Sequence, residues 1–179
     1  YLGASLTDIV NEAETTKGAL YFHFASKDHL AAAVVHEQYA AWPALIAKVS
    51  AEHEGPLAQL RALSYEVARA FREDIVVRAG IRLAAERAVI GVELPTPYVG
   101  WIDQTTGLLR HAQEIGQMRP GLDPPAVART LIAAFFGVQS VSQVLSERRD
   151  LEERLDDLWD LVLPALAPTP DQPPAAPAS

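Results

Sequence analysis

Two short helical patterns near the start of the chain constrain its fold most strongly. The first opens at Ser5, and Asp8 three residues later allows a capping box, in which each side chain bonds the other residue's backbone N–H. Apolar residues then recur at helical spacing, at Leu6, Ile9, Val10 and Ala13. The second pattern, residues 16–22, is too short to form a stable helix alone, so a neighbour must hold it. Together the two patterns predict a helix-turn-helix.

The second pattern and its flanks carry side chains suited to contacting DNA. Small residues at a helix start let the backbone approach phosphates, and the helix N-terminus favours anions. We expect Lys17 to reach a guanine edge or a phosphate. Tyr21, His23 and Lys27 are expected to bind the DNA backbone. On spacing alone, a surface helical hairpin without DNA binding explains the pattern equally well. The candidate DNA-contacting residues are Ser5, Thr15, Thr16, Lys17, Gly18, Ala19, Tyr21, His23 and Lys27.

The residue order in this segment supports a more specific interpretation. TKGALYFHFASKDHLAAAV, residues 16–34, resembles the DNA-binding signature of the TetR family of transcriptional repressors. Within it, KGALYFHF resembles the γ-butyrolactone receptor branch, as do VRAGIRLA at residues 77–84 and ELPTPYVGW at residues 93–101. The resemblance covers most of residues 1–166. It implies an all-α fold, with a TetR-like helix-turn-helix DNA-binding domain, its first helix apparently missing, and a helical ligand-binding and dimerisation domain.

One residue departs from the family pattern. The turn between the two helices usually contains glycine, and here it contains Glu14. A non-glycine residue in a left-handed turn costs about 1 kcal/mol, and this carboxylate would repel DNA phosphates. The net charge of −8 for the whole chain argues against nonspecific binding of nucleic acid by the whole surface. Residues 1–36 carry two lysines against four acidic side chains, and this balance counts against DNA binding. Because the chain starts at Tyr1 without methionine, we expect that a preceding helix, usually with a basic arm, is missing from this sequence.

Helical patterns continue along the rest of the chain. The segment after Ser26 predicts a helix to about residue 50, with a kink or an end at Pro43. An apolar stripe follows Gly55-Pro56, and Asp74 is the expected cap of a helix over residues 75–90. A further helix is expected over residues 98–117, with Ile115 among its inward residues. The predicted domains are residues 1–36 for DNA binding, residues 37–167 for ligand binding and dimerisation, and residues 168–179 as a disordered tail rich in proline and alanine.

The last two predicted helices indicate a homodimer. Ala126–Ser146 is apolar nearly all round between Leu131 and Val138, so it must be buried on two sides. Leu151–Ala167 carries an apolar stripe beside it. Paired across a two-fold axis, the two helices would form a four-helix bundle, as the family resemblance also implies. The alternative is one deep core helix within a monomer.

The larger domain is expected to hold a pocket lined by apolar and aromatic side chains. By resemblance, Trp101 matches the tryptophan that hormone receptors of this branch place against their ligand. Tyr98 could share that wall and donate a hydrogen bond, while Gln38 and Tyr39 could couple a ligand to the DNA-binding unit. Each of these side chains could instead be ordinary core. The candidates are Trp101, Tyr98, Gln38, Tyr39, Trp42, Phe71, Thr130, Phe135 and Phe136.

Composition narrows the remaining classes of function. There is no cysteine, which excludes disulfides and thiolate metal sites, and no P-loop, nucleophile elbow, dinucleotide fingerprint or strict metal spacing appears. The sequence therefore predicts neither an enzyme nor a cofactor, and cytoplasm without a membrane segment is the default. We expect a homodimeric repressor that binds operator DNA and is released by a small lipophilic molecule of the γ-butyrolactone or butenolide type. The alternatives are a TetR-type repressor of an efflux or biosynthesis gene answering an antibiotic-like ligand, and a helical interaction protein without DNA binding.

Overall fold

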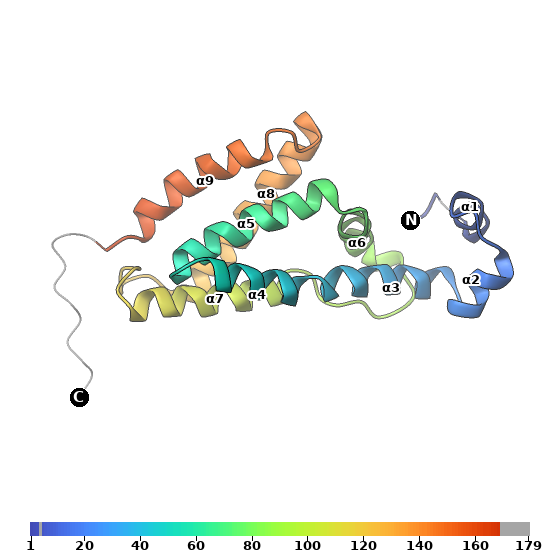
Figure 1. Ribbon diagram of the computed structural model, residues 1–179, viewed down its shortest axis with the longest axis horizontal. Helices are drawn as coiled ribbons and strands as arrows, with labels where there is room; N and C mark the ends of the chain where they lie inside the picture. The colour runs from blue at the N-terminus through green and yellow to red at the C-terminus, as the bar shows by residue number, and fades with distance from the viewer. Residues whose placement is uncertain (4, 169–179) are drawn as a thin grey trace. The chain divides into compact units, whose positions relative to one another are not determined.

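The computed structural model describes residues 1–3 and 5–168, and within them it contains helices and no β-strand. The all-α prediction is confirmed. In chain order (Figure 1) the elements are α1 (Leu6–Glu12), α2 (Lys17–His23), α3 (Lys27–Ala40), α4 (Trp42–Glu52), α5 (Pro56–Glu73), α6 (Ile75–Ala85), the 3-10 turn η1 (Arg87–Val89), α7 (Val99–Glu114), α8 (Pro124–Ser146) and α9 (Leu151–Leu166).

The chain forms two compact units. The first unit comprises Tyr1–Pro43 and Glu73–Pro97, and the second comprises Ala44–Arg72 and Tyr98–Ser179. The chain therefore passes from one unit to the other three times. The first unit holds the helix-turn-helix together with α6, which the sequence analysis placed in the range 37–167, because α6 packs against α3.

Side-chain caps define the short helices of the first unit. The Ser5–Asp8 capping box is present: Asp8 N–H donates to Ser5 Oγ at 3.2 Å, and Ser5 N–H donates to Asp8 Oδ2 at 2.7 Å. The hydrogen bonds that the Ser5 hydroxyl, at 2.6 Å, and the Ser5 backbone N–H donate to the Asp8 carboxylate lower the pKa of Asp8. Thr16 caps α2, and Ser26 caps α3 as expected. Glu14 lies in the turn with φ +49°, so it occupies the left-handed conformation that glycine usually supplies.

The core of the first unit lies where α3 meets α6 and the segment after it. Ala31 and Val35 of α3 pack with Ile90 and Leu94, and Val35 is fully buried. One turn further along α3, Gln38 packs against Gly80 of α6. A Cβ atom at residue 80 would lie 2.3 Å from Gln38 Oε1 and 2.8 Å from Gln38 Cβ, so the glycine is what permits this close approach.

The second unit packs α5, α7, α8 and α9 together. The apolar stripe of α5 is buried, and so are Leu151 and Leu155 of α9. Polar links tie α5 to α9 at the surface: Arg61 pairs with Asp156 at 3.2 Å, and Arg72 pairs with Glu152 at 3.1 Å. Asp123 caps α8, as the sequence indicated. Three of the ligand-site candidates, Trp101, Phe135 and Phe136, line a space between these helices.

Several helix boundaries differ from the sequence predictions for local reasons. The helix expected to about residue 50 is divided, since α3 ends at Ala40 and Pro43 lies in the first turn of α4, where a missing N–H costs nothing. The helix expected over residues 75–90 ends at Ala85 and is followed by η1. Ile115, expected to point inward, is 50% exposed because it follows the end of α7. The predicted tail, apart from Pro168, lies outside the described residues.

Among the described helices, α8 is long and apolar enough to cross a membrane, judged by length and composition alone. Its only charged residue is Arg129, and 22% of its most apolar window is buried. One such helix is weak evidence for a span, because helices at the centre of a bundle have the same composition.

Candidate DNA-binding and ligand-binding sites

The surface of α2 presents the predicted DNA-contacting side chains. Leu20 is buried and anchors the helix, while five predicted residues of α2, Lys17, Gly18, Ala19, Tyr21 and His23, are exposed. Thr15 and Thr16 are also exposed, and Thr16 Oγ1 accepts the N–H of Ala19 at 3.1 Å. The exposed face therefore combines one cation with small residues and hydrogen-bonding side chains. Ser5 lies at the start of α1, where its hydroxyl is part of the capping box.

Lys27 is placed differently from the other candidates. Its ammonium lies 3.8 Å over the ring of Tyr1 and donates to the Tyr1 backbone carbonyl. The side chain is half-buried and engaged within the first unit. Reaching a phosphate would require it to leave these partners.

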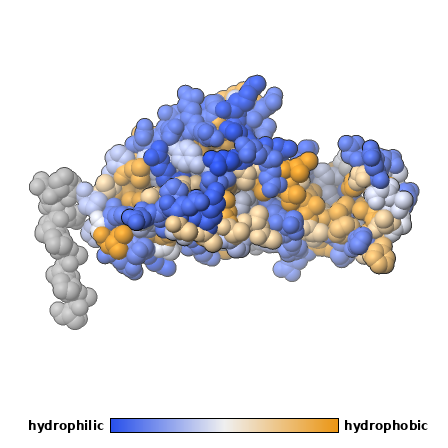
Figure 2. Space-filling view, in the orientation of Figure 1, coloured by the Kyte–Doolittle hydropathy of each residue, from blue (hydrophilic) through white to orange (hydrophobic). Residues whose placement is uncertain are grey.

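Phe22 is an exposed residue that the sequence analysis did not select. Its side chain is 85% exposed, and its ring makes an edge contact with His23 at 5.1 Å between centroids. Figure 2 shows apolar side chains at the surface around α1 and α2. The spacing in the sequence could have indicated this exposure. Phe22 follows Leu20 by two residues, which places the two side chains on opposite sides of a helix. An exposed ring on this helix can make apolar contact with a thymine methyl group.

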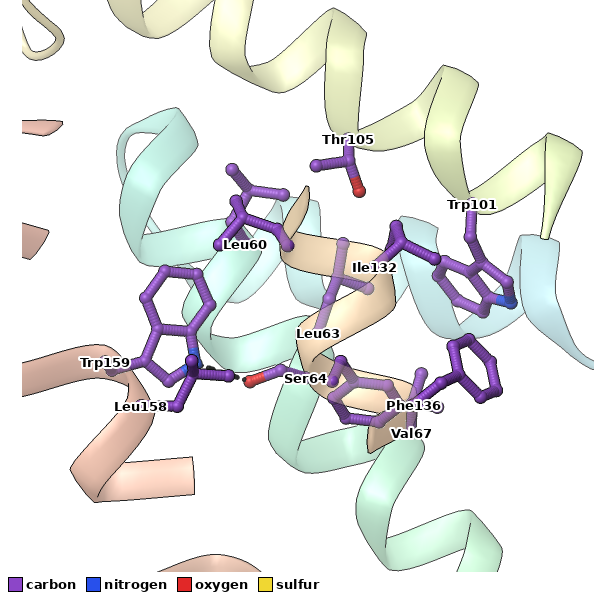
Figure 3. Close-up of a pocket in the computed structure, with 12 residues that line it drawn as sticks. Leu60, Leu63, Ser64, Val67, Trp101, Thr105, Ile132, Phe136, Leu158 and Trp159 are labelled. Carbon is purple, nitrogen blue, oxygen red and sulfur yellow. Dashed lines mark hydrogen bonds between the residues drawn. The ribbon is translucent and has the colours of Figure 1, made fainter. Parts of the chain in front are cut away.

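A pocket lies within the second unit, between α5, α7, α8 and α9 (Figure 3). Its empty volume is about 580 Å³, including space open to solvent. Trp101 and Trp159 stand at opposite ends of the lining in Figure 3. The lining residues are Leu60, Leu63, Ser64, Val67, Trp101, Thr105, Leu131, Ile132, Phe135, Phe136, Leu158 and Trp159.

The polar groups in this lining are few, and none of the lining side chains is ionisable. Trp159 Nε1–H donates to Ser64 Oγ at 2.8 Å, and Ser64 Oγ donates to the Arg61 carbonyl at 2.7 Å. Thr105 lies on α7, one helical turn after Trp101. Each CH₂ group that a ligand moves from water into such a cavity lowers the free energy by about 0.8 kcal/mol. The pocket therefore favours an alkyl chain or another apolar ligand.

The predicted ligand contacts separate into two groups. Trp101, Phe135 and Phe136 line the pocket, and Phe71 is buried behind them, with its ring 5.8 Å from that of Phe135. The other candidates are not in the lining. Tyr98 is 48% exposed and packs against Phe136 from outside.

Four more candidates lie away from this lining. Thr130 is exposed, and its hydroxyl donates to the Ala126 carbonyl at 3.0 Å. Gln38, Tyr39 and Trp42 belong to the first unit. Sequence reasoning also missed Ser64 and Trp159, which are 95 residues apart, because no local pattern pairs residues at that separation.

Comparison with protein families identifies the chain. Residues 1–34 match the model of bacterial regulatory proteins of the tetR family, and residues 55–168 match the tetracyclin repressor-like C-terminal domain. The chain belongs to the TetR family. This family consists of DNA-binding regulators and not of enzymes, as the sequence predicted.

Among curated relatives, this TetR-family chain is 39% identical over 168 residues to the A-factor receptor protein of Streptomyces griseus. The match covers 93% of the chain and 58% of that receptor, so the chain spans less than two thirds of the length of this relative.

Solved structures agree with this placement. A structure that describes the molecular basis for control of antibiotic production by bacterial hormones is 48% identical, with a TM-score of 0.84, covering 93% of this chain and 88% of that one. A γ-butyrolactone receptor (ArpA-like protein) is 29% identical, with a TM-score of 0.78, covering 94% and 79%. CprB from Streptomyces coelicolor, solved with its biological operator sequence, is 30% identical, with a TM-score of 0.81, covering 95% and 81%. The resemblance to the γ-butyrolactone receptor branch is confirmed.

Proposed function

We propose that this TetR-family chain is a repressor that binds operator DNA as a homodimer and is released by a small lipophilic ligand of the γ-butyrolactone or butenolide type. The observation that carries the proposal is the apolar pocket in the second unit of a chain whose first unit holds a helix-turn-helix. The relatives named for an A-factor receptor, a γ-butyrolactone receptor and an operator complex support the same combination of DNA and hormone binding. We propose residues 1–36 as the DNA-binding domain and 37–167 as the ligand-binding and dimerisation domain.

For DNA, we propose that α2 enters the major groove. Lys17 and the small residues after it lie at the start of α2, where backbone N–H groups favour a phosphate. The exposed rings of Tyr21 and Phe22 can contact sugar and thymine methyl groups. We retain as candidate DNA contacts Ser5, Thr15, Thr16, Gly18, Ala19 and His23. Lys27 also remains a candidate, and its ammonium would have to give up its contacts with Tyr1 to reach the DNA.

For assembly, we propose a dimer through Ala126–Ser146 and Leu151–Ala167. Three apolar side chains of α8, Val141, Val144 and Leu145, are 47%, 82% and 68% exposed, and Leu161 of α9 is 75% exposed. Exposed apolar side chains of this size mark interaction surfaces, and we propose that a second copy of the chain covers them. In the dimer two α2 helices read half-sites about 34–36 Å apart, one turn of DNA. A cytoplasmic location follows from action on DNA.

For release, we propose that the ligand occupies the pocket against Trp101, Phe135 and Phe136. A ligand shifts the population of DNA-binding dimers only by its differential affinity for the two states. The segment 73–97 belongs to the first unit, where α6 packs on α3, and the chain continues from both of its ends into the second unit, so it is one covalent link between the two sites.

Operator binding is tested with a duplex that the wild-type protein selects from a randomised pool. Fluorescence anisotropy should show binding that weakens steeply with salt, because phosphate contacts release counterions. Synthetic γ-butyrolactones with alkyl side chains should then release the DNA. Failure to enrich any sequence would contradict DNA binding and favour a helical interaction protein.

An antibiotic-like ligand is the second candidate. The observation that favours it is the aromatic lining, since two indole and two phenyl rings can stack on a flat ring system. Release by such compounds, with no response to any butyrolactone, would decide for this candidate.

A further inference from the structure

Phe136 connects the pocket to aromatic rings outside it. Its ring centroid lies 4.5 Å from that of Tyr98, 6.0 Å from that of Phe71 and 5.4 Å from that of Phe135. Phe136 lines the pocket, whereas Tyr98 and Phe71 do not. A molecule that presses on Phe136 from inside therefore presses on both of these outer rings.

The two outer rings stand where the chain changes units. Phe71 lies one residue before Arg72, where the first stretch of the second unit ends, and Tyr98 is the residue at which that unit resumes. Between them runs the segment 73–97, which carries α6 and packs on α3. The chain on each side of this segment therefore carries an aromatic residue, Phe71 or Tyr98, whose ring contacts Phe136 of the pocket.

The backbone of Tyr98 is strained. Its φ of +70° and ψ of −23° place it in the left-handed region, where a large side chain is rarely found. Tyr98 is also the N-cap of α7, and its side chain makes no capping hydrogen bond. Such a backbone conformation persists only when the surrounding structure holds it. Among the described residues, the aromatic ring that contacts the Tyr98 ring is that of Phe136, edge to face.

We propose that Phe136 and Tyr98 are positioning residues that convert occupancy of the pocket into movement of the segment 73–97. With the pocket empty, Phe136 holds the Tyr98 ring and the left-handed backbone. A ligand displaces Phe136, Tyr98 relaxes, and the end of the segment turns. The inference rests on the proposed function, since it requires that the pocket takes the ligand.

Two substitutions at residue 98 test the relay. Tyr98→Asn removes the ring but keeps a residue that tolerates the left-handed conformation, and Tyr98→Phe keeps the ring and removes only the hydroxyl. Ligand affinity is measured by tryptophan fluorescence with a synthetic alkyl γ-butyrolactone, and release by anisotropy of the selected operator. Circular dichroism verifies that each variant is folded.

We expect Tyr98→Phe to match the wild type in both measurements. Tyr98→Asn should bind the butyrolactone with unchanged affinity but need about tenfold more of it for half-release, which lies within the usual range of coupling between sites. Equal release concentrations for Tyr98→Asn and the wild type would overturn the relay. Weaker ligand binding by Tyr98→Phe would also overturn it, because the hydroxyl would then be a ligand contact.

A third substitution separates the relay from the proposed ligand class. If the wild type binds operator but no butyrolactone, the ligand class is wrong, and Ile132→Trp then fills the pocket without a ligand. We expect Ile132→Trp to weaken operator binding, and Tyr98→Asn added to it to restore binding. Unchanged operator affinity in Ile132→Trp would refute the relay, and a wild type that selects no operator would refute both proposals.

Discussion

The contact between Gly80 and Gln38 gives the sharpest test of how α6 is held on α3. In Gly80→Ala, the added methyl group would lie 2.8 Å from Gln38 Cβ. The Gln38 carboxamide can swing away, but Cβ is fixed to the α3 backbone, so the helices must separate by about half an ångström to reach ordinary contact. Overpacking of this kind costs about 1–3 kcal/mol.

Replacing glycine by alanine in a helix also stabilises the helix by about 1 kcal/mol, and this gain must be removed from the comparison. Gly107 of α7 is the matched control, since it is exposed and no heavy atom lies within 4 Å of its added Cβ. We expect Gly107→Ala to raise the free energy of unfolding by about 1 kcal/mol. The free energy of unfolding of Gly80→Ala should lie about 1–3 kcal/mol below that of Gly107→Ala.

Urea denaturation followed by circular dichroism gives both values. Operator anisotropy for the same two variants shows whether the position of α6 matters for DNA binding, and only Gly80→Ala should change it. Equal stability changes for the two variants would show that α3 and α6 do not approach as closely as the structure indicates.

Three further substitutions test separate parts of the mechanism. Trp101→Ala should keep operator affinity but lose release by the butyrolactone, measured by anisotropy, because Trp101 forms one end of the pocket lining; normal release would place the ligand elsewhere. Lys17→Ala should weaken operator binding and lower the slope of log affinity against log salt by about 1, whereas Lys48→Ala on α4 should leave both unchanged. Hydrogen bonds from Ser142 and Ser146, and then from Arg154, lower the pKa of Asp150 from 3.8 to about 2. The ionised Asp150 carboxylate therefore stabilises the folded chain fully above pH 4, and this stabilisation is lost as the pH falls to 2. The thermal midpoint of Asp150→Asn should therefore fall less than that of the wild type between pH 4 and pH 2.

Local features of the fold could be predicted because they depend on neighbouring residues. The caps at Ser5, Ser26, Asp74 and Asp123 were each recognisable from one polar side chain before an apolar run, and all four accept backbone N–H groups. The left-handed Glu14 was likewise expected from its place in the turn.

The composition of the pocket could be predicted only in part. Helical periodicity shows which face of a helix is apolar but not which helix it meets. The lining includes the candidates Trp101 and Phe135. Thr130 is exposed on α8 and not part of this lining, and its hydroxyl donates to a carbonyl of its own helix. Gln38, a candidate ligand contact, packs on Gly80, because α6 returns to α3 after a long stretch of chain.

Reciprocal binding is the measurement that tests the central claim most directly. The affinity for an alkyl γ-butyrolactone is measured by tryptophan fluorescence with and without saturating operator, and operator affinity is measured with and without the butyrolactone. Since coupling between two sites is reciprocal, we expect operator to weaken ligand binding by the same factor by which the ligand weakens operator binding. A ligand affinity that is unchanged by operator would contradict the coupling of pocket and DNA site.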